Sequence, residues 1–272
     1  MNYISTRNNN KNFTFKDVFL KGLADDGGLF VPKSIKQFKK EDLDNLSNLS
    51  YKDLAAEIIY PFIGDFMSKD ELTSIISNSY SNFRSDDVVK ISVLGNLKVL
   101  ELFHGPTLAF KDIAMQLIGN FYQYHLESDQ KKINIIVATS GDTGSAAIEA
   151  CRGRQAIQIF ILHPKDRVSD VQRRQMTTVN DPNVHNIAVK GSFDDCQNLV
   201  KAMFNDIAFR DYCKLSAVNS ISCRTSAVIG RTSPPATTDP PELLSATETS
   251  PVAGLILRIR PNLSTVYARS AS

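Results

Sequence analysis

The chain has 272 residues, a formal net charge of +2 and 42% hydrophobic residues. This length allows one large or two smaller domains, and the near-balanced charge gives no indication of a nucleic-acid or membrane partner. The four cysteines lack paired metal-ligand spacing, and neither a leader peptide nor an apolar run of membrane-spanning length is present. We therefore expect no metal site and a reducing, cytoplasmic location.

The first 90 residues are predicted to form a mostly helical N-terminal region. Apolar residues recur at helical spacing in three stretches, and Gly27, Gly28 and Pro32 mark a loop between the first two. The predicted helices span residues 15–23, 51–66 and 69–76. No group of residues suited to catalysis appears in this region.

An apolar strand is predicted at 98–103, and the Gly-Pro pair at 105–106 interrupts it. Thr107 can then cap a helix, which places Lys111 in the first helical turn. The positive end of the helix dipole and the apolar neighbours of Lys111 favour the neutral amine, which can attack an aldehyde. On local sequence alone, a solvated surface lysine remains the alternative.

A buried β-branched strand at 133–139 runs into a turn of small residues and then an alanine-rich helix from Thr143. Such a turn points free backbone N–H groups and the hydroxyls of Ser140 and Thr143 at one spot, which suits a carboxylate or phosphate. The turn lacks the lysine of a P-loop and the three glycines of a dinucleotide fingerprint. An ordinary tight turn capped by Asp142 or Thr143 remains the alternative.

Strands and helices continue to alternate downstream, which predicts a parallel α/β sheet. Strands are expected at 156–162 and 184–189, and helices at 169–178 and 193–207. The last helix presents one apolar face, formed by Phe193, Cys196, Leu199, Val200, Met203, Phe204 and Ile207. Because ligands in such sheets bind beyond the carboxyl ends of strands, Lys111 and the loop at 140–144 are expected to converge on one pocket.

Two runs carry a family resemblance: Phe-His-Gly-Pro-Thr-Leu-Ala-Phe-Lys-Asp at 103–112 and Ala-Thr-Ser-Gly-Asp-Thr-Gly-Ser-Ala-Ala at 138–147. Both resemble threonine synthase, a pyridoxal-phosphate enzyme of the tryptophan-synthase-β fold type, known as fold type II. The long subfamily, which includes the threonine synthase-like proteins, also resembles this chain at 3–7, 24–32, 175–178 and 217–221. The resemblance covers about residues 1–221.

The resemblance implies an incomplete α/β fold of type II, with a parallel sheet, flanking helices and a partial catalytic region at 91–221. It also implies conversion of O-phospho-L-homoserine and water to L-threonine and phosphate, a carbon–oxygen lyase reaction that uses pyridoxal 5'-phosphate. Lys111 would link covalently to this cofactor and move protons at the α and β carbons, and Asp142 would lie near the cofactor's ring hydroxyl. The substrate carboxylate would be held by Ser140, Gly141, Thr143 and Gly144, and the approach to the lysine would be shaped by His104 and Thr107.

The stretch 222–272 differs from the rest, with no lysine, five arginines and a Pro/Ser/Thr-rich segment. It is expected to be a divergent, disordered tail. The resemblance places a Gly-Asn-Phe-Gly loop for the cofactor phosphate downstream of 221, and this sequence does not contain it. The expectation is therefore a truncated threonine synthase-like chain whose activity is open.

Two alternatives remain at this point. A related pyridoxal-phosphate lyase would release 2-oxobutyrate from the same substrate, so product analysis would separate it from the synthase. A non-catalytic remnant or binding protein would fold without taking up the cofactor. The sequence does not predict an oligomeric state, and the only expected partner is the small-molecule substrate.

Overall fold

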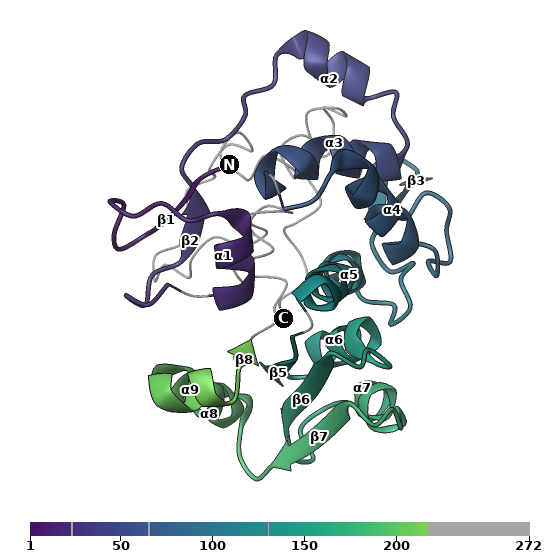
Figure 1. Cartoon of the computed structure of the whole chain (residues 1–272). Coiled ribbons are helices and arrows are strands. Elements are labelled where there is room, and N and C mark those ends of the chain that lie inside the picture. The colour runs from purple at the N-terminus through teal and green to yellow at the C-terminus, as the bar shows by residue number, and fades with distance from the viewer. Residues whose placement is uncertain (23, 65, 130, 217–272) are drawn as a thin grey trace, which may run out of the picture. The chain divides into compact units, whose positions relative to one another are not determined.

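The computed structural model of the chain describes residues 1–22, 24–64, 66–129 and 131–216 (Figure 1). The predicted tail at 222–272 and the motif at 217–221 lie outside the described residues. Two compact units can be distinguished. The first contains described residues of 1–76 and 89–101, and the second contains those of 77–88 and 102–220.

The first unit contains the three predicted N-terminal helices, with ends shifted by a few residues, and a further helix, α2 (Lys40–Leu46), that was not predicted. The predicted helices are α1 (Phe15–Lys21), α3 (Tyr51–Ile63) and α4 (Lys69–Ser79), which continues into the second unit. A two-stranded antiparallel sheet of β1 (Tyr3–Ser5) and β2 (Phe30–Pro32) was not predicted, because three-residue strands carry almost no periodic signal. The buried Tyr3 hydroxyl donates to the carbonyl of Phe62 in α3 at 2.8 Å, which ties this sheet to the helices.

The strand predicted at 98–103 is present as β4 (Leu97–Glu101), but it does not belong to the parallel sheet. It pairs antiparallel with β3 (Lys90–Leu94), and the two strands form a separate sheet. The two-residue turn at Gly95 and Asn96 explains the difference, since a glycine with φ of +60° at the first central position suits a tight hairpin. The prediction that Lys111 follows a strand of the parallel sheet was therefore wrong.

The second unit contains the predicted parallel sheet with flanking helices. Its strands are β5 (Ile133–Ala138), β6 (Ile157–Pro164), β7 (Val184–Val189) and β8 (Leu215–Ser216), arranged in the order β7-β6-β5-β8. Its helices are α5 (Lys111–Asp129), α6 (Asp142–Cys151), α7 (Asp170–Thr177), α8 (Phe193–Asn205) and α9 (Ile207–Tyr212). All strand pairs in this sheet are parallel, as the strand–helix alternation predicted.

Helices cover both faces of this sheet (Figure 1). Alternate residues of β6 point to opposite layers: Ile161 lies against Gly144 of α6, whereas Leu162 packs with Cys196 of α8. Helix α5 packs on α6 at Gly119, where an added Cβ would lie 2.3 Å from the carbonyl oxygen of Ala150. The helix that begins with Lys111 is therefore held closely against the helix that begins with Asp142.

The helix predicted at 193–207 is shorter than expected. It ends at Asn205 because Asp206 is extended, and the Asp206 carboxylate accepts from the Phe209 N–H to start α9. Ile207 therefore belongs to α9 and is 57% exposed, so its assignment to the apolar face of the helix at 193–207 was wrong. Leu199, 42% exposed, also lies at the margin of that face.

In the described part of the chain, no helix has the length and apolar character needed to cross a bilayer.

Candidate active site

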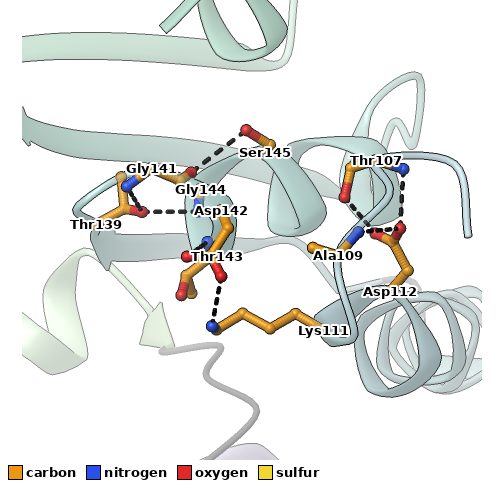
Figure 2. Close-up of polar contacts among 10 residues, drawn as sticks. All are labelled: Thr107, Ala109, Lys111, Asp112, Thr139, Gly141, Asp142, Thr143, Gly144 and Ser145. Carbon is orange, nitrogen blue, oxygen red and sulfur yellow. Dashed lines mark hydrogen bonds and ion pairs between the residues drawn. The ribbon is translucent and has the colours of Figure 1, made fainter. Parts of the chain in front are cut away.

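The amine of Lys111 and the carboxylate of Asp142 meet at the junction of α5 and α6 (Figure 2). The Lys111 Nζ lies 2.8 Å from Asp142 Oδ2, and it also lies 4.4 Å from the centre of the Phe110 ring. The lysine side chain is only 12% exposed, whereas that of Asp142 is 35% exposed. The structure thus brings Lys111 against the loop at 140–144 through Asp142, and the expectation that they share one pocket stays a prediction.

The segment before α5 is organised by Asp112 rather than by a Thr107 cap. The Thr107 N–H and hydroxyl donate to the two Asp112 carboxylate oxygens at 2.8 and 2.6 Å, and the Ala109 N–H lies 3.4 Å from Oδ2. Helix α5 begins at Lys111, four residues after Thr107, so the prediction that Thr107 accepts from the helix was wrong. Burial raises the pKa of Asp112, and the hydrogen bonds from Thr107 and Ala109 oppose that shift.

Backbone geometry in this segment leaves little space for other side chains. A Cβ added to Gly105 would lie 2.4 Å from the Asp112 Cβ, so only glycine lets the chain pass this close. Leu108 has a φ of +63°, which is uncommon for a residue with a side chain. The turn therefore holds Lys111 at the helix start in one defined backbone geometry.

The loop between β5 and α6 is held together by the Thr139 hydroxyl. This oxygen accepts from the N–H groups of Gly141 and Gly144 at 2.9 and 2.8 Å (Figure 2), and Thr139 is 1% exposed. The Thr143 N–H donates to the carboxylate of the preceding Asp142 at 2.9 Å. Three of the N–H groups predicted to be free for an anion are therefore already used within the loop.

The glycines of this loop also make close contacts with α7. Gly141 has a φ of +148°, and a Cβ on it would lie 2.2 Å from the Gln172 Oε1. A Cβ on Gly144 would lie 2.6 Å from the sulfur of the fully buried Met176. Gly144 is therefore required for packing, whereas Gly141 is favoured by its positive φ, because the end of the Gln172 side chain could move.

The hydroxyls of Ser140 and Thr143 differ from the three loop N–H groups in that they are not used to hold the loop together. Ser140 is exposed and Thr143 is half-buried, and neither hydroxyl makes a hydrogen bond among the residues the structure describes. His104 is half-buried, and its carbonyl accepts from the Arg84 N–H at 2.8 Å. Within the described residues, three loop N–H groups are thus occupied, whereas these two hydroxyls are not.

Sequence reasoning missed three residues that shape this site: Thr139, Asp112 and Gln175. The Gln175 Nε2 donates to the Thr107 carbonyl at 3.3 Å, which links α7 to the segment before Lys111. Thr139 ends a buried strand just before the small-residue turn, and that position could have suggested a hydrogen-bonding role. Gln175 carries no local signal, because its partner is fixed only by the tertiary fold, whereas the partners of Asp112 lie three and five residues before it.

Two family models match this chain. Residues 2–80 match the model "Threonine synthase N terminus", and residues 96–225 match the model "Pyridoxal-phosphate dependent enzyme". The second match contains Lys111 and the loop at 140–144.

Curated relatives from bacteria, yeast and animals agree with these matches. Threonine synthase of Pseudomonas aeruginosa is 48% identical over 223 residues, which cover 82% of this chain and 48% of the relative. Threonine synthase of Saccharomyces cerevisiae is 46% identical over 236 residues, which cover 81% of this chain and 46% of the relative. Threonine synthase-like 2 of Pongo abelii is 42% identical over 222 residues, which cover 81% of this chain and 46% of the relative. The chain spans about half the length of the curated relatives it matches.

Solved structures show the same relationship at the level of the fold. The "PLP bound Threonine synthase from Brucella melitensis" has a TM-score of 0.76 and 47% sequence identity, covering 84% of this chain and 49% of that one. The threonine synthase of Escherichia coli has a TM-score of 0.75 at 31% sequence identity, and the match covers 84% of this chain and 52% of that one. This chain therefore belongs to the threonine synthase family and has the α/β fold of type II pyridoxal-phosphate enzymes.

Proposed function

We propose that the chain carries the catalytic lysine and the substrate loop of a threonine synthase. The reaction converts O-phospho-L-homoserine and water to L-threonine and phosphate, with pyridoxal 5'-phosphate as cofactor. The observation that carries the proposal is the shielded Lys111 amine 2.8 Å from Asp142, beside a loop with two available hydroxyls. The chain spans about half the length of its relatives, so the proposal for the complete reaction rests on the residues of this half alone.

The residues present fit the aldehyde end of this cofactor. Lys111 provides a primary amine whose side chain is largely withdrawn from water, which suits covalent attachment to an aldehyde. Asp142, which contacts the lysine, would accept a hydrogen bond from the cofactor's ring hydroxyl. When bound, pyridoxal phosphate withdraws electrons from the carbons near the substrate amino group and so lowers the barrier to proton removal.

Lys111 then acts as the base and acid at the substrate. Its Nζ accepts the proton from the α carbon and exchanges a proton with the β carbon, positions that one flexible amine can reach in turn. Phosphate would leave from the γ carbon with the electron pair of the C–O bond, and a proton added there would give the methyl group. Water would supply the hydroxyl at the β carbon, with a proton returned to the α carbon. The contact with Asp142 positions the amine between these steps.

The remaining site residues bind and orient the substrate. The hydroxyls of Ser140 and Thr143 donate to its carboxylate, and the main chain of Gly141 and Gly144 shapes the loop that presents them. His104 and Thr107 line the approach to the lysine. A small-molecule substrate is accordingly the proposed partner, and residues 91–221 are the proposed catalytic region in a cytoplasmic protein.

Product analysis tests this proposal on the full chain. The purified chain is incubated with pyridoxal phosphate and O-phosphohomoserine, and threonine, phosphate and 2-oxobutyrate are measured. We expect threonine and phosphate in equal amounts, abolished in Lys111→Ala and retained in Lys201→Ala, which removes an exposed lysine from α8. Formation of 2-oxobutyrate instead would identify a lyase, and absence of any product from a folded chain would contradict the proposal.

A further inference from the structure

Asp112 follows the proposed catalytic lysine directly, yet its side chain points away from the chemistry. The residue is 0% exposed, and no ion pair in the described part of the chain includes it. A buried carboxylate without a cation is costly unless hydrogen bonds satisfy it. Its contacts therefore indicate what the carboxylate does.

Within the described part of the chain, the hydrogen-bond donors to Asp112 come from one short segment. Thr107 donates through its N–H and its hydroxyl, and Ala109 lies at the outer limit of hydrogen bonding. The Thr107 carbonyl is held as well, by the Nε2 of Gln175 at 3.3 Å. The main chain of Thr107 is thus fixed from both sides, four residues before Lys111.

A second aspartate in the same unit provides an internal comparison. At the start of α8, the N–H and hydroxyl of Ser192 contact one oxygen of Asp195 at 2.6 and 2.8 Å, and Gly191 packs on this carboxylate as Gly105 packs on Asp112. This exposed capping box lowers the pKa of Asp195, chiefly through the bond from the Ser192 N–H. At Asp112, burial outweighs similar hydrogen bonds and raises the pKa.

Asp112 and Asp195 accept similar hydrogen bonds near the start of a helix, but only Asp112 is buried. A carboxylate at the solvent-exposed start of a helix is sufficient to organise a turn, as Asp195 does. Burying the equivalent group at Asp112 adds a desolvation cost that a stability role alone would not require. What burial adds is the exclusion of water, which strengthens the hydrogen bonds from Thr107 relative to the exposed ones at Asp195 and leaves the turn little freedom to move.

We propose that Asp112 is a positioning residue: it locks the segment 105–109 against the first turn of α5 and thereby aims the Lys111 side chain at Asp142. The strained φ of Leu108 fits this role, because the hydrogen bonds on both sides of it hold a backbone conformation that a free segment would leave. The inference rests on the proposed function for the role of Lys111, whereas the locking itself does not depend on a cofactor.

The test uses the full chain and two readouts. The first is amide hydrogen exchange at Thr107 and Ala109 without cofactor, which reports how firmly the segment is held. The second is the rate at which pyridoxal phosphate labels Lys111, trapped by borohydride and located by peptide mass. Asp112→Asn is compared with Asp195→Asn, which makes the same change in the exposed capping box.

Asp112→Asn places an amide N–H₂ opposite a donor of Thr107, so it removes at least one hydrogen bond. We expect exchange at Thr107 to rise by about tenfold or more and labelling of Lys111 to slow by about tenfold. Asp195→Asn should change neither readout. Should Asp112→Asn fail to fold, Thr107→Val removes the same hydroxyl contact, and Thr107→Ser restores it.

Three outcomes would overturn or limit the inference. Unchanged exchange at Thr107 in the folded Asp112→Asn chain would show that the carboxylate does not lock the segment. Faster exchange with unchanged labelling would show that the segment does not aim Lys111. If the unsubstituted chain is not labelled at Lys111, the proposed function fails, and the exchange measurement alone decides whether Asp112 locks the segment.

Discussion

Thr139→Val should loosen the loop that carries Asp142, because one hydroxyl satisfies two buried N–H groups there. Valine has nearly the shape of threonine but cannot accept from Gly141 and Gly144, which the Thr139 oxygen contacts at 2.9 and 2.8 Å. An unsatisfied buried N–H costs about 1–3 kcal/mol, so two such groups, partly relieved by movement toward water, cost about 3 kcal/mol. For a domain of this size, that corresponds to a fall in Tm of about 6–12 °C.

Thr139→Ser is the matched control for this prediction. Serine keeps the hydroxyl and loses only the γ-methyl that packs beside Gly144, which costs about 1 kcal/mol. Thermal unfolding followed by circular dichroism at fixed pH and protein concentration would compare both variants with the unsubstituted chain. The reasoning would be refuted if the valine variant melted at the same temperature as the serine variant or above it.

Three further perturbations test other parts of the account. Gly119→Ala should lower the Tm by several degrees, because a Cβ 2.3 Å from the Ala150 carbonyl forces α5 and α6 apart; an unchanged melt would mean that the helices adjust freely. Tyr3→Phe should destabilise the first unit by about 1 kcal/mol in urea unfolding at neutral pH, since it leaves the Phe62 carbonyl unpaired. Burial raises the pKa of Tyr3, so the unsubstituted chain should lose stability as pH rises above about 10, and the variant should lose less. Burial also raises the pKa of Asp112 from 3.8, so the folded chain binds this proton more tightly than the unfolded chain. The contribution of Asp112 to the free energy of unfolding should therefore fall as the pH rises from 3.8 through the raised pKa. Urea unfolding measured between pH 4 and 7 should show this fall in the unsubstituted chain and not in Asp112→Asn.

The strands and helices that could be predicted are those with long periodic patterns. The β-branched run at 133–139 and the alternation that follows it predicted the parallel sheet, because buried parallel strands read as continuous apolar runs. The hairpin of β3 and β4 was missed, although Gly95 and Asn96 carry the composition of a two-residue turn. An apolar strand by itself does not specify its partner, and only the turn decides the pairing.

The candidate site was predictable as a set of positions but not as a set of contacts. Lys111 and the loop at 140–144 were identified from their places at the start of helices, and the structure brings Lys111 against Asp142. Three of the N–H groups expected to be free in the loop instead donate to Thr139 and Asp142, since a buried donor takes the nearest acceptor the fold provides. Such pairings depend on side-chain directions that sequence spacing does not give.

The most direct test of the central claim is to locate the covalent attachment of pyridoxal phosphate on the full chain. The protein is incubated with the cofactor, reduced with borohydride, digested and analysed by mass spectrometry, beside Lys111→Ala and Lys201→Ala. The account predicts one dominant adduct at Lys111, lost in Lys111→Ala and retained in Lys201→Ala. Adducts spread over several exposed lysines, or a dominant adduct that persists without Lys111, would contradict it.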